Sequence, residues 1–285
     1  MVEIRRNVKT KSRVGQIVLN ATIIFLLFIM IFPLAMALWN SFKFDYLFES
    51  TKWYPTLPLV VSNVGDAFVI LWKYILNTVE VGVLGGIGLI FIASISAYTF
   101  AKMKFPGRKI MYVMVIALLM MPGILTLVPQ VKIYKTLGLY KTDSIFALLL
   151  PLWTSGPIFG VFLLTSFFRG IPNDVFESAR IDGANEFICF VRIALPMCLP
   201  IMGTLAIMTL VNIWNDYLWP MTIMQDRFTI AAALVQKFNN PSSGVQSNQP
   251  LQFAGYFVAS IPIILLFVFC NKFYIEGLIG SSIKL

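Results

Sequence analysis

The sequence predicts an all-α integral membrane protein with six transmembrane helices. Of its 285 residues, 58% are hydrophobic and only 12% are charged, whereas about 25% of the residues in an average soluble domain are charged. The mean hydropathy is +0.82. Six separate apolar stretches are long enough, or nearly so, to cross a hydrocarbon layer of about 30 Å. So few charges could not cover a water-exposed surface, which argues against a soluble globular protein.

Each expected span is predominantly apolar over most of its length. In chain order the spans are expected at residues 16–38, 74–101, 110–128, 145–168, 194–218 and 253–274. The first is too long for the apolar region of a signal peptide. It is followed by Trp39 and Phe42 rather than by a small-residue cleavage site, so we expect a retained helix. The expected organisation is an N-terminal segment (1–15), a membrane domain (16–274) and a C-terminal tail (275–285).

The placement of lysine and arginine predicts how the chain is oriented in the membrane. With an even number of spans both termini share a side, and that side collects 14 of the 22 basic residues. We therefore expect this side, with both termini, to be cytoplasmic. The net charge of +9 mostly reflects this bias, so a nucleic-acid partner is not needed to explain it.

Several kinds of chemistry are excluded by missing residues. The chain has no histidine, which rules out a Ser-His-Asp triad and histidine metal ligands. Its three cysteines form no CxxC pair, and no GxxxxGK[ST] loop for ATP phosphates is present. No helix face carries a carboxylate pair for acid–base work. We expect this chain to be no enzyme and to hold no metal or cofactor.

The charged segment 169–193, between the fourth and fifth spans, predicts a helix that lies at the membrane surface. Asn173 or Asp174 is expected to cap this helix. If Asp174 is the cap, Glu177 stands at the third helical position, in an arrangement similar to a capping box. Asp182-Gly183 is expected to end it, because glycine accepts the left-handed conformation of a helix C-terminus.

A second short helix should follow, so that the whole segment is a helix-turn-helix elbow. Asn185 is expected to cap this second helix, and Pro196 to start or kink the next span. The elbow combines charges of both signs with apolar residues at near-helical spacing. Such an amphipathic surface favours docking onto a partner over a plain solvated loop.

The residues of the elbow resemble the signature loop of ABC importer permeases, usually written EAA…G…LP. The match runs from Glu177 through Ser178, Ala179, Arg180, Asp182 and Gly183 to Leu195-Pro196. The Ile-Asp-Gly-Ala variant, with stretches 96–109, 128–151, 214–220 and 276–285, is similar to the carbohydrate (maltose-type) branch. Two residues depart from the family pattern: Ser178 stands where alanine is usual, and Leu285 where glycine is frequent.

This resemblance implies a type I ABC importer permease fold in a bacterial or archaeal cytoplasmic membrane. It implies that the elbow is a coupling helix that docks on an ATPase subunit through Glu177, Ser178, Ala179, Arg180, Asp182 and Gly183. The implied partners are membrane lipid, a second homologous permease, two ATPase subunits that carry ATP and Mg²⁺, and an extracytoplasmic solute-binding protein. The implied substrate is a carbohydrate, more specifically an oligosaccharide.

Polar residues inside apolar spans are costly and usually face a cavity or a partner helix. The substrate-path candidates are Glu80, Thr154, Ser155, Asn212, Asn215, Asp216 and Tyr217. A carboxylate at the exterior interface remains an equal alternative for Glu80, and helix packing is the stronger alternative for Thr154 and Ser155. We expect Trp219 to belong to an aromatic belt at the interface.

The exterior loop between the last two spans is polar and uncharged. Its candidates for contact with a binding protein are Asn239, Asn240, Gln246 and Asn248, and a disordered linker is the even alternative.

Other functions remain open. A permease for glycerol-phosphate-type substrates predicts convergent arginine or lysine inside the spans, and none is visible. An ion-coupled secondary transporter predicts internal repeats and broken helices, and leaves the charged elbow unexplained. A membrane enzyme is disfavoured by the missing histidine and carboxylate pair.

Overall fold

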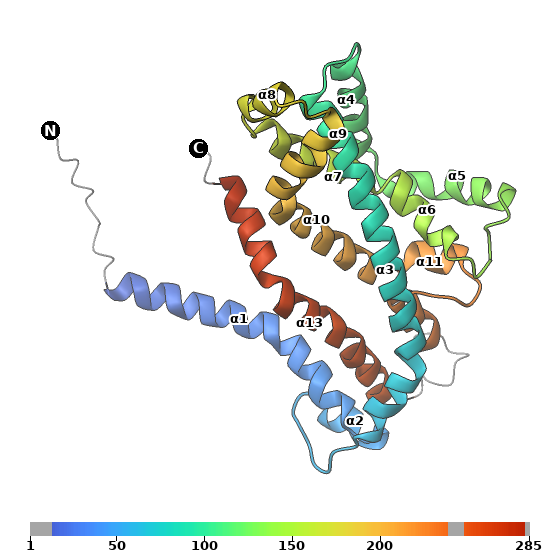
Figure 1. Cartoon of the computed structure of the whole chain (residues 1–285). Helices are drawn as coiled ribbons and strands as arrows, with labels where there is room; N and C mark the ends of the chain where they lie inside the picture. The colour runs from blue at the N-terminus through green and yellow to red at the C-terminus, as the bar shows by residue number, and fades with distance from the viewer. Residues whose placement is uncertain (1–12, 239–247, 283–285) are drawn as a thin grey trace.

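The computed structural model describes residues 13–238 and 248–282, and these ranges form a bundle of helices without a β-strand (Figure 1). Five of its helices are long and apolar enough to cross a membrane, and a sixth span is obtained when one sharply bent helix pair is counted as one. The prediction of an all-α membrane protein is confirmed. The elements are α1 (Arg13–Ser41), α2 (Asp45–Thr51), α3 (Ser62–Lys102), α4 (Arg108–Ala117), η1 (Leu118–Met120), α5 (Gly123–Thr136), α6 (Phe146–Thr154), α7 (Pro157–Arg169), α8 (Asn173–Ile181), α9 (Glu186–Ile188), η2 (Cys189–Ala194), α10 (Leu195–Asn215), α11 (Leu218–Ile223), α12 (Ile230–Ala233), η3 (Leu234–Phe238) and α13 (Gln249–Ser282).

The third expected span is not a continuous helix. The α4–η1 segment and α5 meet at an angle of 100°. Met121 is extended there, with φ −82° and ψ 119°, and Pro122 follows it. Proline cannot donate a main-chain hydrogen bond and pushes the preceding residue out of the helical region, so the helix ends at this point.

The fifth span begins earlier than expected. A single helical stretch runs from Glu186 to Asn215 through α9, the π-helical turn η2 and α10. The expected second helix of the elbow is therefore the first turn of the span itself. Pro196 lies at the start of α10, directly after the π-helical turn, and does not begin a separate helix.

The packed interior is divided into two hydrophobic cores at different levels of the bundle. The elbow-end core lies beside α8 and contains Leu89, Ala93, Tyr98, Leu164, Phe168, Phe176 and Leu205. The α2-end core lies toward the opposite end and contains Leu71, Val81, Leu148, Ile213, Trp219, Ile223 and Phe238. Helix α3 contributes to both cores and so forms the axis of the molecule (Figure 1).

Close helix packing in the elbow-end core depends on a small residue. A Cβ atom added at Gly160 of α7 would lie 2.9 Å from Ala93 of α3 and 2.9 Å from Leu205 of α10. Any side chain larger than hydrogen would therefore separate three helices, as expected where membrane helices pack through glycine.

Helix α1 lies at the edge of the bundle: its C-terminal part packs against α13, and its N-terminal part points away from the other helices (Figure 1). In its most apolar stretch no residue is buried within the chain, and Phe25, Phe28 and Met30 are all exposed. In a membrane this apolar surface must face lipid or another membrane helix.

Candidate functional site

The elbow ends its first helix with a glycine in the left-handed conformation. Gly183 has φ +86°. The Gly183 amide donates to the Arg180 carbonyl (3.1 Å), and the Ala184 amide donates to the Ala179 carbonyl (2.9 Å). These two bonds form a Schellman motif, which satisfies carbonyl groups at the end of α8. The predicted helix stop at Asp182-Gly183 is therefore confirmed.

The start of α8 differs from the expectation. Its N-cap is Pro172, no side chain caps the helix, and Asp174 lies in the first turn. The predicted capping by Asn173 or Asp174 is wrong, because the helix begins directly after Pro172 and both residues lie in its first turn. The carboxylate of Asp174 still interacts favourably with the positive end of the helix dipole. The predicted cap at Asn185 is confirmed, since its side-chain oxygen accepts from the Ile188 amide at 2.9 Å.

Polar contacts attach the elbow firmly to the end of α3. The Glu186 carboxylate accepts from the Tyr98 hydroxyl (2.9 Å) and from Arg180 Nε (2.9 Å). Lys102 Nζ donates to the Ile171 carbonyl (2.6 Å) and to Asn173 Oδ1 (2.8 Å). Each element of the elbow is thus tied to α3, so a force on the elbow reaches the main axis of the bundle.

Hydrophobic contacts complete this attachment. Phe176 of α8 is 1% exposed and packs against Tyr98, whose ring also contacts Phe168 and Phe190. The Lys102 ammonium lies over the Phe176 ring, 4.8 Å from its centroid. One face of α8 is therefore buried, and the other is left open.

The open face carries the predicted docking residues. Glu177, Ser178, Arg180, Asp182 and Gly183 are exposed, and Ala179 is half-buried. Beside them Ile181 is 87% exposed, which is unusual for an isoleucine on a short charged helix. Ile181 was not among the predicted docking residues, although an apolar residue directly before Asp-Gly was a visible signal.

Three helices are interrupted around one internal region between the two cores. The bend between α4 and α5, the break between α6 and α7, and the end of α10 all adjoin this region. Non-helical main chain at membrane depth is tolerated where it is buried in protein or lines a cavity. The breaks therefore lie where the main chain borders open space inside the membrane domain.

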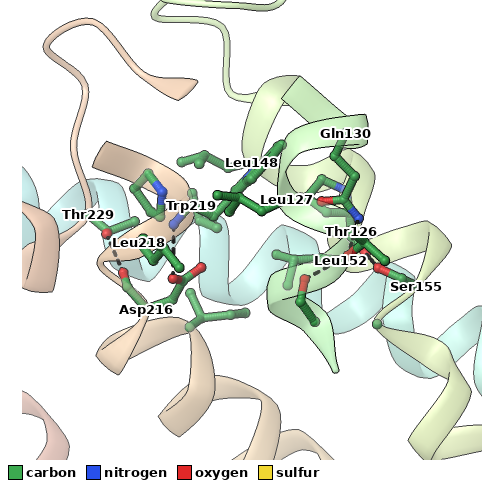
Figure 2. A pocket seen from close by; sticks show the side chains of 16 residues that line it. Thr126, Leu127, Gln130, Leu148, Leu152, Ser155, Asp216, Leu218, Trp219 and Thr229 are labelled. Carbon is green, nitrogen blue, oxygen red and sulfur yellow. Dashed lines mark hydrogen bonds between the residues drawn. The ribbon is translucent and has the colours of Figure 1, made fainter. Parts of the chain in front are cut away.

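The region consists of three adjoining cavities of about 410, 540 and 500 Å³, all of which Gly156 lines. Thr126, Gln130 and Ser155 gather on one side of the first cavity, while Asp216 and Thr229 lie on the other (Figure 2). None of the described residues that line the three cavities is lysine or arginine. The lining thus offers hydroxyl and amide groups and one carboxylate to a ligand.

The hydroxyl groups of the lining donate to the main chain. Ser155 Oγ donates to the Pro151 carbonyl (3.1 Å), Thr126 Oγ1 to the Gly123 carbonyl (2.8 Å), and Thr229 Oγ1 to the Asp216 carbonyl (3.1 Å). Each oxygen keeps lone pairs that can accept from a ligand. Such a surface suits a neutral ligand that carries many hydroxyl groups.

Four of the seven predicted path residues line these cavities: Thr154, Ser155, Asn212 and Asp216. Asn215 and Tyr217 are not among the lining residues, and the Asn215 amide donates to the Val211 carbonyl at 2.8 Å. Sequence reasoning missed Thr126, Gln130, Thr209 and Thr229. Their signal was available, because each is a polar residue within or beside an apolar stretch.

Glu80 lies outside the cavities and forms an ion pair with Arg227. It is 22 residues before Lys102 on α3, and so about 33 Å from the elbow end of that helix. This distance is close to the thickness of the hydrocarbon layer, as expected for a carboxylate near the opposite interface.

Asp143 lies beside this pair and binds the main chain of the segment after α11, which contains Arg227. Its Oδ1 accepts from the amides of Asp226 and Arg227, each at 2.9 Å. These two hydrogen bonds to the carboxylate hold the pKa of Asp143 below its ordinary value.

Trp219 is only 9% exposed and belongs to the α2-end core. Its indole nitrogen donates to the Ala147 carbonyl (3.1 Å), and its ring meets Tyr134 edge-on at 4.9 Å. The expected place in an interfacial belt is therefore wrong, because the short helix α11 turns the side chain inward.

Of the four candidates for contact with a binding protein, only Asn248 is among the residues that the structure describes. Asn239, Asn240 and Gln246 lie outside the described residues. Asn248 accepts from the Leu251 amide at 3.0 Å and so caps the start of α13.

Comparison with known proteins agrees with this architecture. A solved structure from a bacterial ABC transporter that imports the acidic polysaccharide alginate superposes with a TM-score of 0.77 at 20% identity, covering 92% of this chain and 98% of the other. The arabinooligosaccharide transport system permease of Bacillus subtilis (strain 168) is 31% identical over 75% of this chain and 74% of its own length. The diacetylchitobiose uptake permease of Streptomyces coelicolor is 32% identical over 68% of this chain and 64% of its own length.

The broken helices alone fit an ion-coupled secondary transporter as well as an importer permease, so they do not separate the two. The protein family to which the chain belongs separates the two. The family described as "Binding-protein-dependent transport system inner membrane component" matches residues 86–275, which include the elbow and every residue that lines the cavities except Val81. The chain therefore belongs to the family of inner-membrane components of binding-protein-dependent transport systems.

Proposed function

We propose that this chain is a permease subunit of an ABC importer that moves a neutral oligosaccharide into the cytoplasm. The observation that carries the proposal is the pairing of two features in one bundle. An exposed elbow is anchored to α3 through Glu186 and Lys102, and cavities with hydroxyl and amide groups in their lining lie between the two cores. The relatives named for arabinooligosaccharide and diacetylchitobiose transport support the substrate class.

In this proposal the elbow end faces the cytoplasm, and both termini lie on that side. The support is the basic bias of the sequence, with 14 of 22 lysine and arginine residues on the elbow side. Each of two ATPase subunits binds ATP and Mg²⁺, and one of them receives the open face of α8. The exposed Ile181 supplies an apolar anchor for that contact, and Glu177, Arg180 and Asp182 supply its polar surround.

A second, homologous permease completes the pathway, and a solute-binding protein delivers the sugar from the exterior. Closure of the ATPase subunits moves the elbow, and through α3 it shifts the pathway between outward-open and inward-open states. The cavity then binds the sugar through hydroxyl and amide groups contributed by Thr126, Gln130, Ser155 and Asn212.

A glycerol-phosphate-type substrate is the second candidate, and the lining disfavours it. A phosphate ester calls for charge-assisted bonds from arginine or lysine, and the described lining contains neither. An acidic sugar is disfavoured because the lining offers no lysine or arginine to pair with its carboxylate, and Asp216 would repel that carboxylate.

Proteoliposomes test the proposal directly. The chain, co-expressed with its partner subunits, is reconstituted with the binding protein and supplied with radiolabelled neutral oligosaccharides or glycerol phosphate. We expect accumulation of a neutral oligosaccharide that requires ATP on the ATPase side. Uptake that needs only an ion gradient would overturn the importer proposal, and uptake of glycerol phosphate alone would overturn the substrate class.

A further inference from the structure

A long apolar groove runs along the outside of the bundle, between α3 and the continuous helix α9–η2–α10. Its volume is about 540 Å³. On its rim Ile87 is 65%, Phe91 61% and Phe187 72% exposed. Its polar side chains, Ser94, Tyr98, Thr99 and Glu186, are few. The groove therefore offers a continuous apolar channel that opens toward the surrounding membrane.

At the elbow end this groove continues into a small basic pocket of about 310 Å³. Met103 and Glu186 line both spaces, and Lys102, Lys104 and Arg180 complete the pocket. Three cationic groups thus face a single carboxylate. Arg180 pairs with that carboxylate, whereas the hydrogen-bond partners of Lys102 are a carbonyl and an amide oxygen. The pocket consequently holds an excess of about two positive charges.

These two spaces together fit one kind of occupant. An apolar helix of a neighbouring subunit would cover the groove but leave the lysines without a counter-charge. A free phosphate would neutralise the lysines but leave the apolar groove uncovered. A molecule with an apolar chain and an anionic head satisfies both. The groove extends from Ile87 to Met103, about 24 Å along α3, which exceeds the roughly 15 Å of hydrocarbon in one leaflet.

We propose that this groove is a binding site for an anionic phospholipid. The phosphate group lies at Lys102 and Lys104, and one acyl chain lies between α3 and α10. Because Lys102 attaches α8 to α3 and Arg180 attaches α8 to Glu186 of α9, the bound lipid braces the elbow against the bundle. The proposal does not depend on which substrate the chain transports.

Native mass spectrometry of the complex purified with its partner subunits tests the site. The complex is stripped of lipid in detergent and titrated with phosphatidylglycerol or with phosphatidylcholine of the same acyl chains. We expect phosphatidylglycerol to bind preferentially. Lys104→Gln should weaken its binding about fivefold, which matches ~1 kcal/mol for one basic residue near an anionic lipid surface. Ile95→Trp, which fills the groove, should weaken it at least as much.

Matched controls separate this site from ordinary boundary lipid. Lys109→Gln and Ile110→Trp alter exposed residues of α4 that line neither space, and they should leave binding unchanged. Equal binding of the two lipids, or wild-type binding by both Lys104→Gln and Ile95→Trp, would overturn the proposal. So would a photo-crosslinker at Ile95 that captures the neighbouring permease instead of lipid.

Discussion

Arg227, in the segment after α11, pairs its guanidinium with the carboxylate of Glu80 on α3, although 147 residues separate them in the sequence. The same loop is held by Asp143, which accepts from the amides of Asp226 and Arg227. Three distant segments are thus joined at one point on the α2 side of the cavities. This junction lets the segment around α11 move together with α3.

The ion pair predicts a modest and specific stability effect. Both side chains are partly exposed, at 32% and 43%, so Glu80→Gln should cost about 0.5–1 kcal/mol. Thermal unfolding of the four members of a double-mutant cycle with Arg227→Gln measures the coupling. The exposed pair Glu49–Lys52 provides a control with an expected coupling near zero. Additive effects of Glu80→Gln and Arg227→Gln would show that the pair contributes nothing.

The pH dependence of the same junction follows from Asp143. Its pKa is lowered in the folded protein because two main-chain amides bind the carboxylate. Its contribution to the free energy of unfolding is therefore fully present above the pKa of the carboxyl group in the unfolded chain, near 4. That contribution is lost as the pH falls through the lower pKa of the folded protein. The difference in thermal unfolding midpoint between the wild type and Asp143→Asn should be constant from about pH 7 to 5 and shrink below pH 4. A difference that grows on acidification would contradict this assignment.

Gly183 and Gly107 form a matched pair for testing the elbow. They have φ values of +86° and +78°, and a Cβ atom at either would meet no atom within 4 Å. Valine should therefore strain both positions by a similar 1–2 kcal/mol or so. Only Gly183 lies on the proposed docking face, so Gly183→Val should lower ATP-driven uptake more than about tenfold, the effect of losing ~1.4 kcal/mol of docking energy. Gly107→Val should insert equally well and keep most of its uptake; equal losses in both variants would remove the coupling role.

The cavity can be filled from the start of α5. Gly123 lines two of the three cavities, and a Cβ atom there would meet nothing within 4 Å. Gly123→Leu should therefore fold but occupy the space of the sugar, and uptake should fall at least about tenfold through steric exclusion of the substrate. Gly65→Leu, at an exposed and equally open position on α3, is the control. Normal uptake by Gly123→Leu would place the substrate path elsewhere.

Most of the fold was predictable because lipid restricts the choice of structure. Apolar length alone located the membrane helices, and glycine and asparagine chemistry located the turn at Gly183 and the cap at Asn185. Pro122 also signalled the bend at Met121-Pro122, since proline ends helices. The apolar stretch around it is uninterrupted, however, and so predicted a single continuous helix. The start of the fifth span at Glu186 was hidden because a π-helical turn leaves no composition signal.

The site was predictable only in part. Thr154, Ser155, Asn212 and Asp216 stood out as polar residues in apolar spans, and all four line the cavities. Gln130 and Thr229 come from segments whose positions depend on the bend and on the loop after α11, so tertiary packing decides their role. Trp219 shows the same limit, because an interfacial and a buried tryptophan have the same sequence signature.

The broken helices have a consequence for how such a transporter changes over evolution. Gly123 and Gly156 line the cavities at the starts of α5 and α7, and glycine can contribute only main-chain atoms. A substitution at either glycine adds a side chain to this surface: a Cβ atom at Gly123 would meet nothing within 4 Å, whereas one at Gly156 would lie 2.4 Å from the Leu152 carbonyl oxygen. Substitution at Gly123 is therefore expected to reshape the cavity without disturbing the fold, whereas Gly156 is held fixed by the main chain of α6.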